Sequence, residues 1–429
     1  MAEPRFCSGL ILTAPGEPLF PGTLSWQDGR ITDIRRDRAP APEDPVIAPG
    51  FIDSHTHPVE LGLEGVYPDL SEARTIAEVL DRLRRADKAD PGDGILFGLN
   101  LDPDRLAEGR LPTRAELDAL APGRPVVVCR VDRHSAAAGS AALRLAGIEA
   151  GPDGLLSGPD YERAACAFSH ALPPGIIAAA LEHAAALAAR TGTTTLGALD
   201  GVEDYSLDNW RELVALMNRR PVRFVPFLQT RRPETAARLG LPRVGGCILV
   251  DGSLGSHTAA LAGDYADAAG ERGRLYLTDD ELTRFLAEAD ALGLQTAVHA
   301  IGDRAVAQAL CCHERARTRS ELRHRIEHAV LLDAGLIAAI AGRGLLLGVQ
   351  PAFEANWGGP DRLYAHRLGP RHRQTNPFRS LLRAGVRLAG GSDAPITPVD
   401  PLAGIRAALA HPNPDERIGP DAALALFTT

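Results

Sequence analysis

The stretch Ala48-Pro49-Gly50-Phe51-Ile52-Asp53-Ser54-His55-Thr56-His57-Pro58 decides both the fold and the chemistry of this chain. It is typical of the end of a strand, because an apolar run follows the Pro-Gly turn and Pro58 stops it. Alternate side chains of a strand share a face, so His55 and His57 point the same way and can hold one metal ion. Two imidazoles leave a metal ion short of ligands, so further ligands must come from other segments.

Composition limits the class of protein. The 429 residues are 45% hydrophobic, which is ample for a large core, and their formal net charge of -9 gives no basic surface for nucleic acid. The six cysteines form no C-x-x-C pair, which favours free thiols in a reducing compartment. No signal peptide and no apolar run long enough to cross a bilayer is found, so we expect a cytoplasmic protein without membrane contact.

Strand and helix patterns alternate from about residue 176 onward, which predicts an α/β fold. With the His-x-His strand, eight strands are expected. The other seven lie at residues 193–199, 222–228, 246–250, 294–299, 325–330, 345–350 and 386–390. Such alternation favours parallel strands closed into a (β/α)8 TIM barrel. A doubly wound open sheet is the alternative, but the first strand lacks the Gly-rich phosphate loop of that fold.

Two segments lie outside the regular pattern. Residues 1–49 alternate short apolar runs with turns, including the hairpin signal Asp28-Gly29, and predict a small β domain. Residues 50–429 form the barrel. Within it, residues 60–175 are predicted to be an insertion after the first barrel strand, with a helix at 75–88 and strands at 95–101 and 125–131. Long insertions in catalytic barrels usually cover the site, so we interpret this one as a cap or lid.

Polar side chains recur where the predicted strands end, which is where a barrel builds its active site. Any one of them could be an ordinary hydrogen-bonding residue, but together they predict a shared site. In chain order they are His55, His57, Asp200, Gln229, Cys247, Asp251, His299, His328, Gln350 and Asp393.

Six segments resemble the amidohydrolase superfamily, and more closely its type 3 or YtcJ-like branch, which includes N-substituted formamide deformylases. They are Pro49 to His57, Leu111 to Asp118, Asp251-Gly252-Ser253-Leu254-Gly255-Ser256, His299-Ala300-Ile301-Gly302-Asp303, Arg325-Ile326-Glu327-His328-Ala329 and Gly391-Ser392-Asp393-Ala394-Pro395. The resemblance implies a distorted barrel whose metal and catalytic shell is His55, His57, His299, His328 and Asp393.

The resemblance also implies a reaction. A zinc-like divalent ion activates water and polarises a carbonyl, so hydrolysis of a C–N bond in a small amide, formamide or cyclic amide is expected. Asp393 would be the general acid and base, and His328 would bind a second ion or stabilise the tetrahedral intermediate. Two alternatives stay open: a deaminase of an amino-substituted ring, and a non-catalytic small-molecule binder.

The chain departs from the family pattern at Cys247, where many relatives carry a lysine that can be carbamylated to bridge two metal ions. The only lysine is Lys88, on a predicted helix of the insertion, so a carbamate bridge is excluded. Cys247 is either a thiolate ligand or a buried apolar cysteine. One ion is the expected complement, and a second stays open.

Several other polar residues receive a predicted role. Candidate substrate contacts are His134, His257, Asp251 and Gln350. Seven further histidines are expected at the surface: His170, His183, His313, His324, His366, His372 and His411. Cys311 and Cys312 are neighbours on a helix and cannot serve one ligand together.

The last residues, Leu426 to Thr429, stop where relatives add a β segment that completes the small N-terminal sandwich. The N-terminal domain is therefore expected to be incomplete or reduced to a smaller sheet. An open edge needs cover, and contact between two copies in a homodimer is one way to give it.

Overall fold

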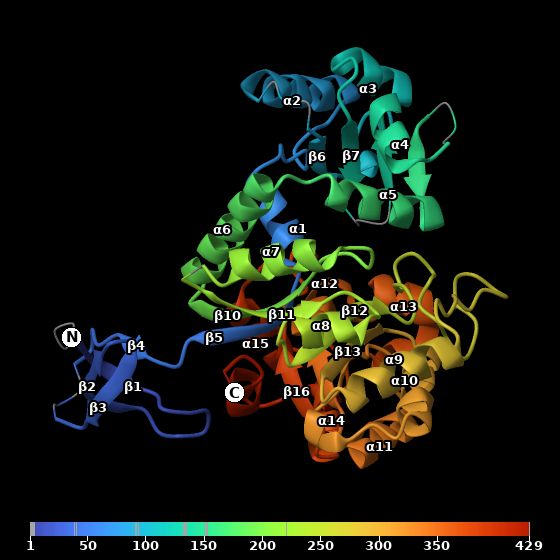
Figure 1. The fold of residues 1–429 in the computed structure, drawn as a ribbon. Helices are drawn as coiled ribbons and strands as arrows, with labels where there is room; N and C mark the ends of the chain where they lie inside the picture. Colours follow the sequence, from blue (N-terminus) through green and yellow to red (C-terminus); the bar gives the residue numbers. More distant parts are fainter. Residues whose placement is uncertain are drawn as a thin grey trace.

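The computed structural model describes residues 5–37, 39, 41–90, 92, 94–131, 135–149, 151, 153–219 and 221–428, which fold around three sheets (Figure 1). The largest sheet is an eight-stranded parallel barrel, and the two smaller sheets belong to the N-terminal segment and the insertion. Predicted site residue His134 lies outside the described residues.

The barrel confirms the eight predicted strands and their parallel order. Along the sheet they are β5 (Phe51–Thr56), β10 (Thr193–Asp200), β11 (Arg223–Leu228), β12 (Arg243–Leu249), β13 (Gln295–Ala300), β14 (Arg325–His328), β15 (Leu346–Val349) and β16 (Arg387–Gly390). Between β16 and β5 the closure is a single bridge, Thr56 to Ala394. Lower on the same seam, Ile52 N donates to Phe427 O at 2.7 Å and Gly390 N donates to Leu426 O at 2.7 Å. The barrel is thus closed by backbone from both ends of the sequence.

Helices cover the outside of the barrel and bury one apolar face each. They are α1 (Pro58–Leu63), α6 (Pro174–Arg190), α7 (Leu207–Met217), α8 (Pro233–Arg238), α9 (Asp279–Ala291), α10 (Asp303–Arg315), α11 (Ala334–Arg343), α12 (Pro351–Trp357), α13 (Leu363–Leu368), α14 (Phe378–Arg383), α15 (Pro401–Leu409) and α16 (Pro420–Ala425), with 3-10 turns η2 (Ser320–Leu322), η3 (Gly369–Gln374) and η4 (Pro414–Glu416). Helix α9 illustrates the rule: Thr278 and Glu281 form a capping box at its start, and Leu282, Phe285 and Leu286 are buried. Full burial of each such side chain contributes about 2 kcal/mol.

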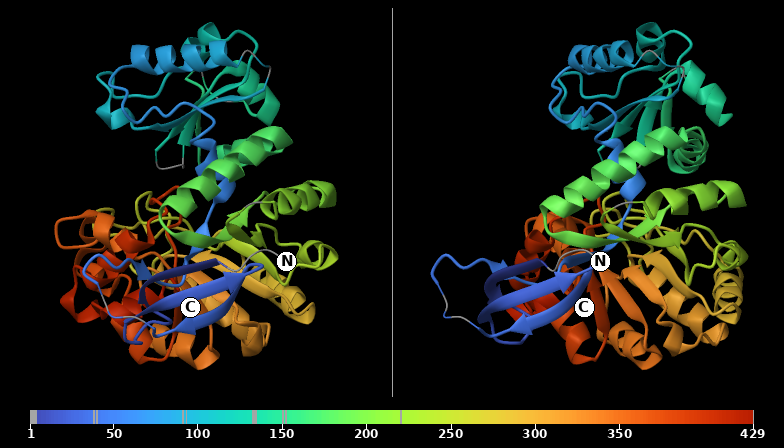
Figure 2. Two further views of the ribbon diagram at one scale, coloured as in Figure 1. Left: turned by 90° about the vertical axis from the view of Figure 1, so that its left-hand side faces the viewer. Right: turned by 60° about the vertical axis from the view of Figure 1, so that its left-hand side comes forward.

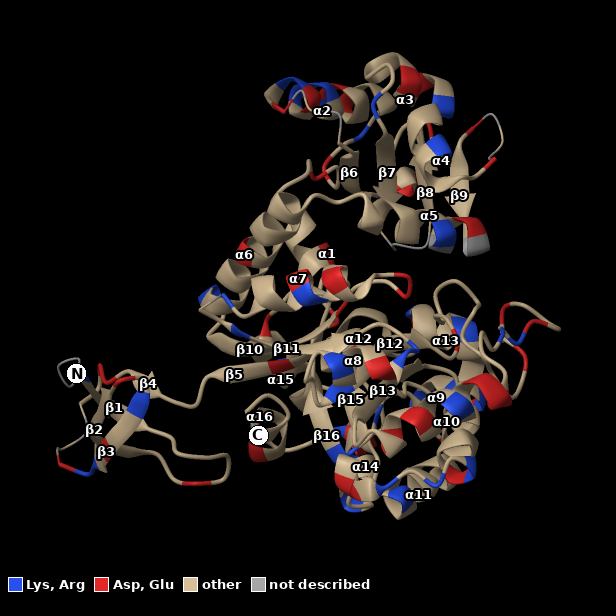
Figure 3. Cartoon of the chain, viewed as in Figure 1, with Lys and Arg blue, Asp and Glu red and all other residues tan. Residues whose placement is uncertain are grey.

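Positions of Lys and Arg and of Asp and Glu are interspersed along these helices (Figure 3). On two neighbouring helices, Arg315 of α10 pairs with Asp279 of α9 at 3.6 Å. Because these pairs are exposed, each adds little to stability. The covering helices therefore depend on apolar packing against the strands.

The insertion is a small three-layer domain of its own. Its sheet has the order β6 (Leu96–Leu101), β7 (Val126–Arg130), β8 (Ser135–Ala138) and β9 (Leu155–Ser157). Helices α2 (Ile76–Ala89) and α3 (Arg114–Leu120) share an apolar cluster with one face, and α4 (Ser140–Ala146) and α5 (Gly158–His170) with the other; η1 (Pro103–Arg105) is a short turn. In Figures 1 and 2 this domain stands over one end of the barrel, next to α1 and α6, which follow β5 and precede β10.

The N-terminal sheet projects from the side of the barrel (Figure 2). Its order is β3 (Arg30–Arg35), β2 (Phe20–Gln27), β1 (Arg5–Ile11) and β4 (Val46–Ile47). Within the described residues it is one layer, and apolar side chains on it remain in solvent: Phe6 is 73% and Ile31 is 62% exposed.

The prediction of seven surface histidines is wrong for three of them. His313, His324 and His411 are 0%, 1% and 1% exposed. His313 lies on the buried stripe of α10 together with Val306, Ala309 and Leu310, a spacing that repeats every three or four residues. His170 and His366 are exposed as predicted, and His183 and His372 are partly exposed.

In the described part of the chain, no single helix has the length and apolar character needed to cross a membrane. One bent helix pair, Arg163–His170 with Pro174–Arg190, passes that test only when the two are taken together.

Candidate metal centre

Three of the predicted ligands meet where β5 and β16 end. The Nε2 atoms of His55 and His57 each lie 3.2 Å from Oδ1 of Asp393. His55 is fully buried, and Asp393 is 7% exposed. The His-x-His strand and the loop after β16 thus present two imidazoles and a carboxylate to one point, as the sequence predicted.

His299, His328 and Cys247 complete the cluster from the neighbouring strands. Sγ of Cys247 lies 3.5 Å from Nδ1 of His299 and 4.0 Å from Nε2 of His328. The ring of His328 is 4.4 Å from that of His299 and 4.8 Å from that of His55, measured between centroids. The structure therefore brings all six predicted metal-binding residues together.

One nitrogen of each histidine is fixed by an acceptor outside the cluster. His55 Nδ1 lies 2.7 Å from Oε2 of Glu327, and His57 Nδ1 lies 2.7 Å from the carbonyl of Leu199. His299 Nε2 lies 3.1 Å from the carbonyl of Gly252, and His328 Nδ1 lies 2.8 Å from Oε1 of Gln350. With one nitrogen of each ring facing an outside acceptor, the other nitrogen of every ring is directed at the common centre. Acceptors of this kind orient metal-binding histidines.

Glu327 is the site residue that the sequence analysis missed as such. It is fully buried and accepts two bonds from Arg325, at 2.7 Å from Nε and 2.9 Å from Nη2. The Arg325 guanidinium helps hold the pKa of Glu327 near 2 although burial opposes this, so the carboxylate that orients His55 stays charged. An Arg and a Glu two residues apart on a buried strand were the available signal, because such side chains share a face.

Two predicted substrate contacts turn out to position ligands. Asp251 is fully buried, and its oxygens accept from the backbone amides of Ala260, Ile301 and Gly302 at 2.8–2.9 Å. Its Oδ1 is also 3.6 Å from Nε2 of His299. Gln350 is fully buried against His328. Neither side chain is open to a substrate, so direct contact is not the role that this geometry gives them.

His257 lies in the loop after β12, apart from the cluster. Its Nε2 is 3.0 Å from Oδ1 of Asp267, and its ring packs edge-on against Tyr265. The side chain is 31% exposed. These two contacts stabilise the loop. A contact between His257 and substrate stays a prediction.

The backbone is strained where the ligands need it. His328 and Asp393 have φ angles of 70° and 57°, values that residues other than glycine rarely adopt. The loop of Asp393 is held by Asp53, whose Oδ1 accepts from Ser392 N at 2.9 Å. Gly391 allows close approach, because a Cβ there would lie 2.7 Å from Cβ of His55.

Charges within the cluster oppose the effect of burial. Burial disfavours charged imidazoles, but the Asp393 carboxylate outweighs it and raises the pKa of His55 and His57 well above the usual range. Burial likewise opposes the Cys247 thiolate, yet His299 holds the pKa of the thiol well below its usual value. Despite its burial, His299 has its pKa raised to about 9 by Cys247. A metal ion would replace the protons that these groups share.

The donor set fits a zinc-like ion. Imidazole, carboxylate and thiolate are its usual protein ligands. Two groups have their ligand atoms within 4.8 Å of one another, namely His55 with His57 and Asp393, and His55 with Cys247 and His328. Nε2 of His55, common to both, is buried and makes no hydrogen bond. Buried polar atoms are rarely left in this state, so the site is built to receive a ligand there.

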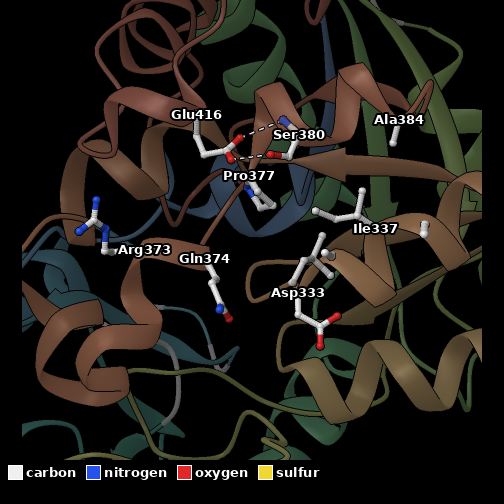
Figure 4. A pocket seen from close by; sticks show the side chains of 11 residues that line it. Asp333, Ile337, Arg373, Gln374, Pro377, Ser380, Ala384 and Glu416 are labelled. Atoms are coloured by element: carbon white, nitrogen blue, oxygen red, sulfur yellow. Dashed lines mark hydrogen bonds between the residues drawn. The ribbon is translucent and has the colours of Figure 1, made fainter.

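A cavity of about 360 Å³ elsewhere is not this site (Figure 4). It is lined by residues of α11 and α14 and of the segments before α14 and at η4. It has two carboxylates. Glu416 accepts from the backbone and the hydroxyl of Ser380 at 2.9 and 2.6 Å, and Asp333 accepts from Leu336 N at 2.8 Å. These bonds cap the starts of α14 and α11, so both carboxylates have a structural role.

Known proteins are similar to this chain in sequence and in fold. The model of the amidohydrolase family matches residues 43–429. YtcJ of Bacillus subtilis (strain 168) is 32% identical over 405 residues, which cover 87% of this chain and 75% of that protein. An N-substituted formamide deformylase of Arthrobacter pascens is 26% identical, covering 98% and 85%. The crystal structure of an uncharacterized metal-dependent hydrolase from Pyrococcus furiosus superposes with a TM-score of 0.81 at 26% identity, covering 98% of this chain and 92% of that one. The chain belongs to the amidohydrolase family.

Proposed function

We propose that this protein is a metal-dependent hydrolase that cleaves a C–N bond in a small molecule, an amide, formamide or cyclic amide, with zinc as its ion. The observation that carries the proposal is the orientation of the four histidines. Each has one nitrogen fixed from behind and the other directed at the centre that Asp393 also faces. A histidine that only fills the core needs no centre of other ligand-type side chains in front of its second nitrogen.

The relatives agree with this reaction. One is named for deformylation of N-substituted formamides, and a similar solved structure is named a metal-dependent hydrolase. A divalent ion held by these residues would lower the pKa of water to about 7 and polarise the carbonyl under attack.

Asp393 is the residue that moves the proton. Its carboxylate is nine-tenths buried beside His55 and His57, which keep it charged. A charged carboxylate at this position accepts the proton of the attacking water and delivers it to the leaving nitrogen. The amine then leaves as a neutral group, which completes cleavage of the C–N bond.

His328 acts from the other side of the centre. Because Nδ1 lies 2.8 Å from Oε1 of Gln350, Nε2 is the nitrogen directed at the centre. This orientation suits a metal ligand. Donation of a hydrogen bond to the substrate oxygen would need a second proton on the ring, so the ligand role is the one that the Gln350 contact favours.

The test combines metal loading with a substrate panel. Metal-free protein, zinc-reconstituted protein and the zinc-reconstituted variant Asp393→Asn are assayed on formamides, linear amides, cyclic amides and aminated rings. We expect zinc-dependent release of amine from the amide groups, and a loss of about 10²–10⁴-fold in the variant. The matched control is His366→Asn, because His366 is an exposed histidine of α13 that is not part of the cluster.

Other outcomes would reject the proposal. Release of ammonia from aminated rings alone would identify a deaminase. Zinc binding without turnover on any member of the panel would identify a binding protein, and full activity in Asp393→Asn would remove that residue from its role.

A further inference from the structure

Strand β12 is distorted at the point where it reaches the site. Its pairing with β13 shifts register between Gly245 and Ile248, so the segment before Ile248 bulges. Gly245 and Gly246 have φ angles of 97° and 88°, which favour glycine. A Cβ on Gly245 would lie 2.4 Å from the carbonyl of Ala297. Bulges next to active sites redirect a side chain, and here the redirected residue is Cys247.

The redirected thiol lies among the imidazoles of the cluster. Besides the 3.5 Å and 4.0 Å approaches to His299 and His328, its sulfur lies within 4.8 Å of a ring nitrogen of His55. It therefore faces the His55–His57–Asp393 group on one side and the His299–His328 pair on the other. Of these rings, His55 is fully buried and its Nε2 makes no hydrogen bond.

Apolar packing accounts for only one side of this cysteine. Cys247 borders a small cluster inside the barrel formed by Leu199, Phe227 and Ala297. A cysteine that only filled this cluster would need neither a glycine bulge nor contact with the histidines. The arrangement serves a sulfur that is used from the histidine side.

We propose that Cys247 is a thiolate ligand shared between the two halves of the site, which enables the protein to hold two borderline-soft ions such as Zn²⁺ or Co²⁺. The inference rests on the proposed function, because it concerns the same centre. Binding forms metal–sulfur bonds and releases the thiol proton to solvent. Thiolate selects zinc and cobalt over the hard ions Mg²⁺ and Mn²⁺.

Cobalt titration of the full-length protein tests the proposal, because a thiolate bound to Co²⁺ gives a charge-transfer absorption that imidazole and carboxylate do not. The metal-free wild type, Cys247→Ser and Cys311→Ser are compared. Cys311 is an exposed cysteine on α10 and is the matched control. We expect the wild type and Cys311→Ser to bind two equivalents with the charge-transfer band. Cys247→Ser should lose the band and one equivalent.

Each other outcome is decisive. Cobalt bound to the wild type without the band, or a band retained in Cys247→Ser, overturns the thiolate ligand and leaves the proposed hydrolase intact. Failure of the wild type to bind cobalt or zinc overturns both. If the variant does not fold, X-ray absorption of zinc-loaded wild type decides instead: a sulfur neighbour at ~2.3 Å is expected, and a shell of nitrogen and oxygen alone refutes the proposal.

Discussion

Strand β14 has a buried histidine at each end, and the two histidines differ in the partners of their ring nitrogens. His328 ends the strand at the barrel mouth, where Gln350 holds one nitrogen and the other is directed toward Cys247. His324 precedes the strand at the opposite end of the barrel and uses both nitrogens, Nδ1 toward Thr296 and Nε2 toward Asp290. Its neighbour His313 is equally buried, with ring centroids 5.3 Å apart.

The difference shows that burial alone does not make a metal site. Burial lowers the pKa of His324 and lowers that of His313 to about 3, so this pair stays neutral and structural. At the mouth, a carboxylate and a thiol keep protons on imidazoles that are just as deeply buried. What distinguishes a ligand is a free nitrogen facing a shared centre that also contains negative charge.

The largest effect is expected from His55→Gln, because His55 belongs to both candidate ligand groups. We expect zinc affinity to fall by more than about 10²-fold, beyond the loss that follows removal of an outer-shell partner. His324→Gln is the matched change at the other end of the barrel and should leave zinc affinity unchanged. Isothermal titration with zinc measures both, and equal losses would erase the distinction between the two clusters.

Glu327→Gln should weaken zinc binding by about 10–100-fold, because the residue orients His55 without touching the ion. The control is Asp290→Asn, which removes the carboxylate that faces His324 at 3.3 Å. Competition with a chelator of known affinity gives the ratio of the zinc affinities of each variant and the wild type. If Asp290→Asn weakens binding as much as Glu327→Gln, the effect is loss of stability and not loss of ligand orientation.

Zinc binding should weaken as the pH falls. The raised pKa values of His55 and His57 mean that the metal-free rings carry protons at neutral pH, which zinc must displace. For each displaced proton, the zinc affinity should fall about tenfold when the pH decreases by one unit. The number of displaced protons is measured by mixing the protein with zinc in weak buffer and following proton release with an indicator dye. If no protons are released, the site histidines are already neutral in the metal-free protein, like His313 and His324 at the opposite end of the barrel.

The smallest effect concerns the stability of the metal-free fold. His313 has its pKa lowered from 6.5 to about 3, so below pH 6.5 the unfolded chain takes up a proton that the folded chain refuses. The free energy of unfolding should therefore fall as pH decreases from 6.5 toward 3, by about 1 kcal/mol at pH 5.5. Urea unfolding of the metal-free wild type and of His313→Gln measures this, and parallel pH profiles would contradict it.

The sequence was sufficient for the barrel and for the convergence of the six candidate ligands at one place. Parallel strands place their carboxyl ends at one mouth, so polar residues at predicted strand ends must converge whatever the loop geometry. The same reasoning failed for Asp251 and Gln350. A strand-end position does not reveal whether a side chain faces the mouth or supports a neighbour from behind.

Residues that depend on packing were harder to predict. His313 was assigned to the surface although its spacing from Val306, Ala309 and Leu310 follows the buried stripe of α10, so the signal was present and overlooked. His324 offered no such pattern, because it lies in an irregular segment before β14. The bulge at Gly245 and Gly246 is a property of the pairing with β13, which a single strand's sequence does not specify.

The contact between β5 and β16 determines when in folding the barrel can close. Strand β5, which carries His55 and His57, is closed on this side by the bridge to Ala394 and by the backbone of Leu426 and Phe427, more than 330 residues later in the sequence. Closure thus joins residues that are far apart in the sequence, and contacts of this kind slow folding. A polypeptide that ends before Asp393 would carry His55 and His57 without the carboxylate that faces them in the folded barrel.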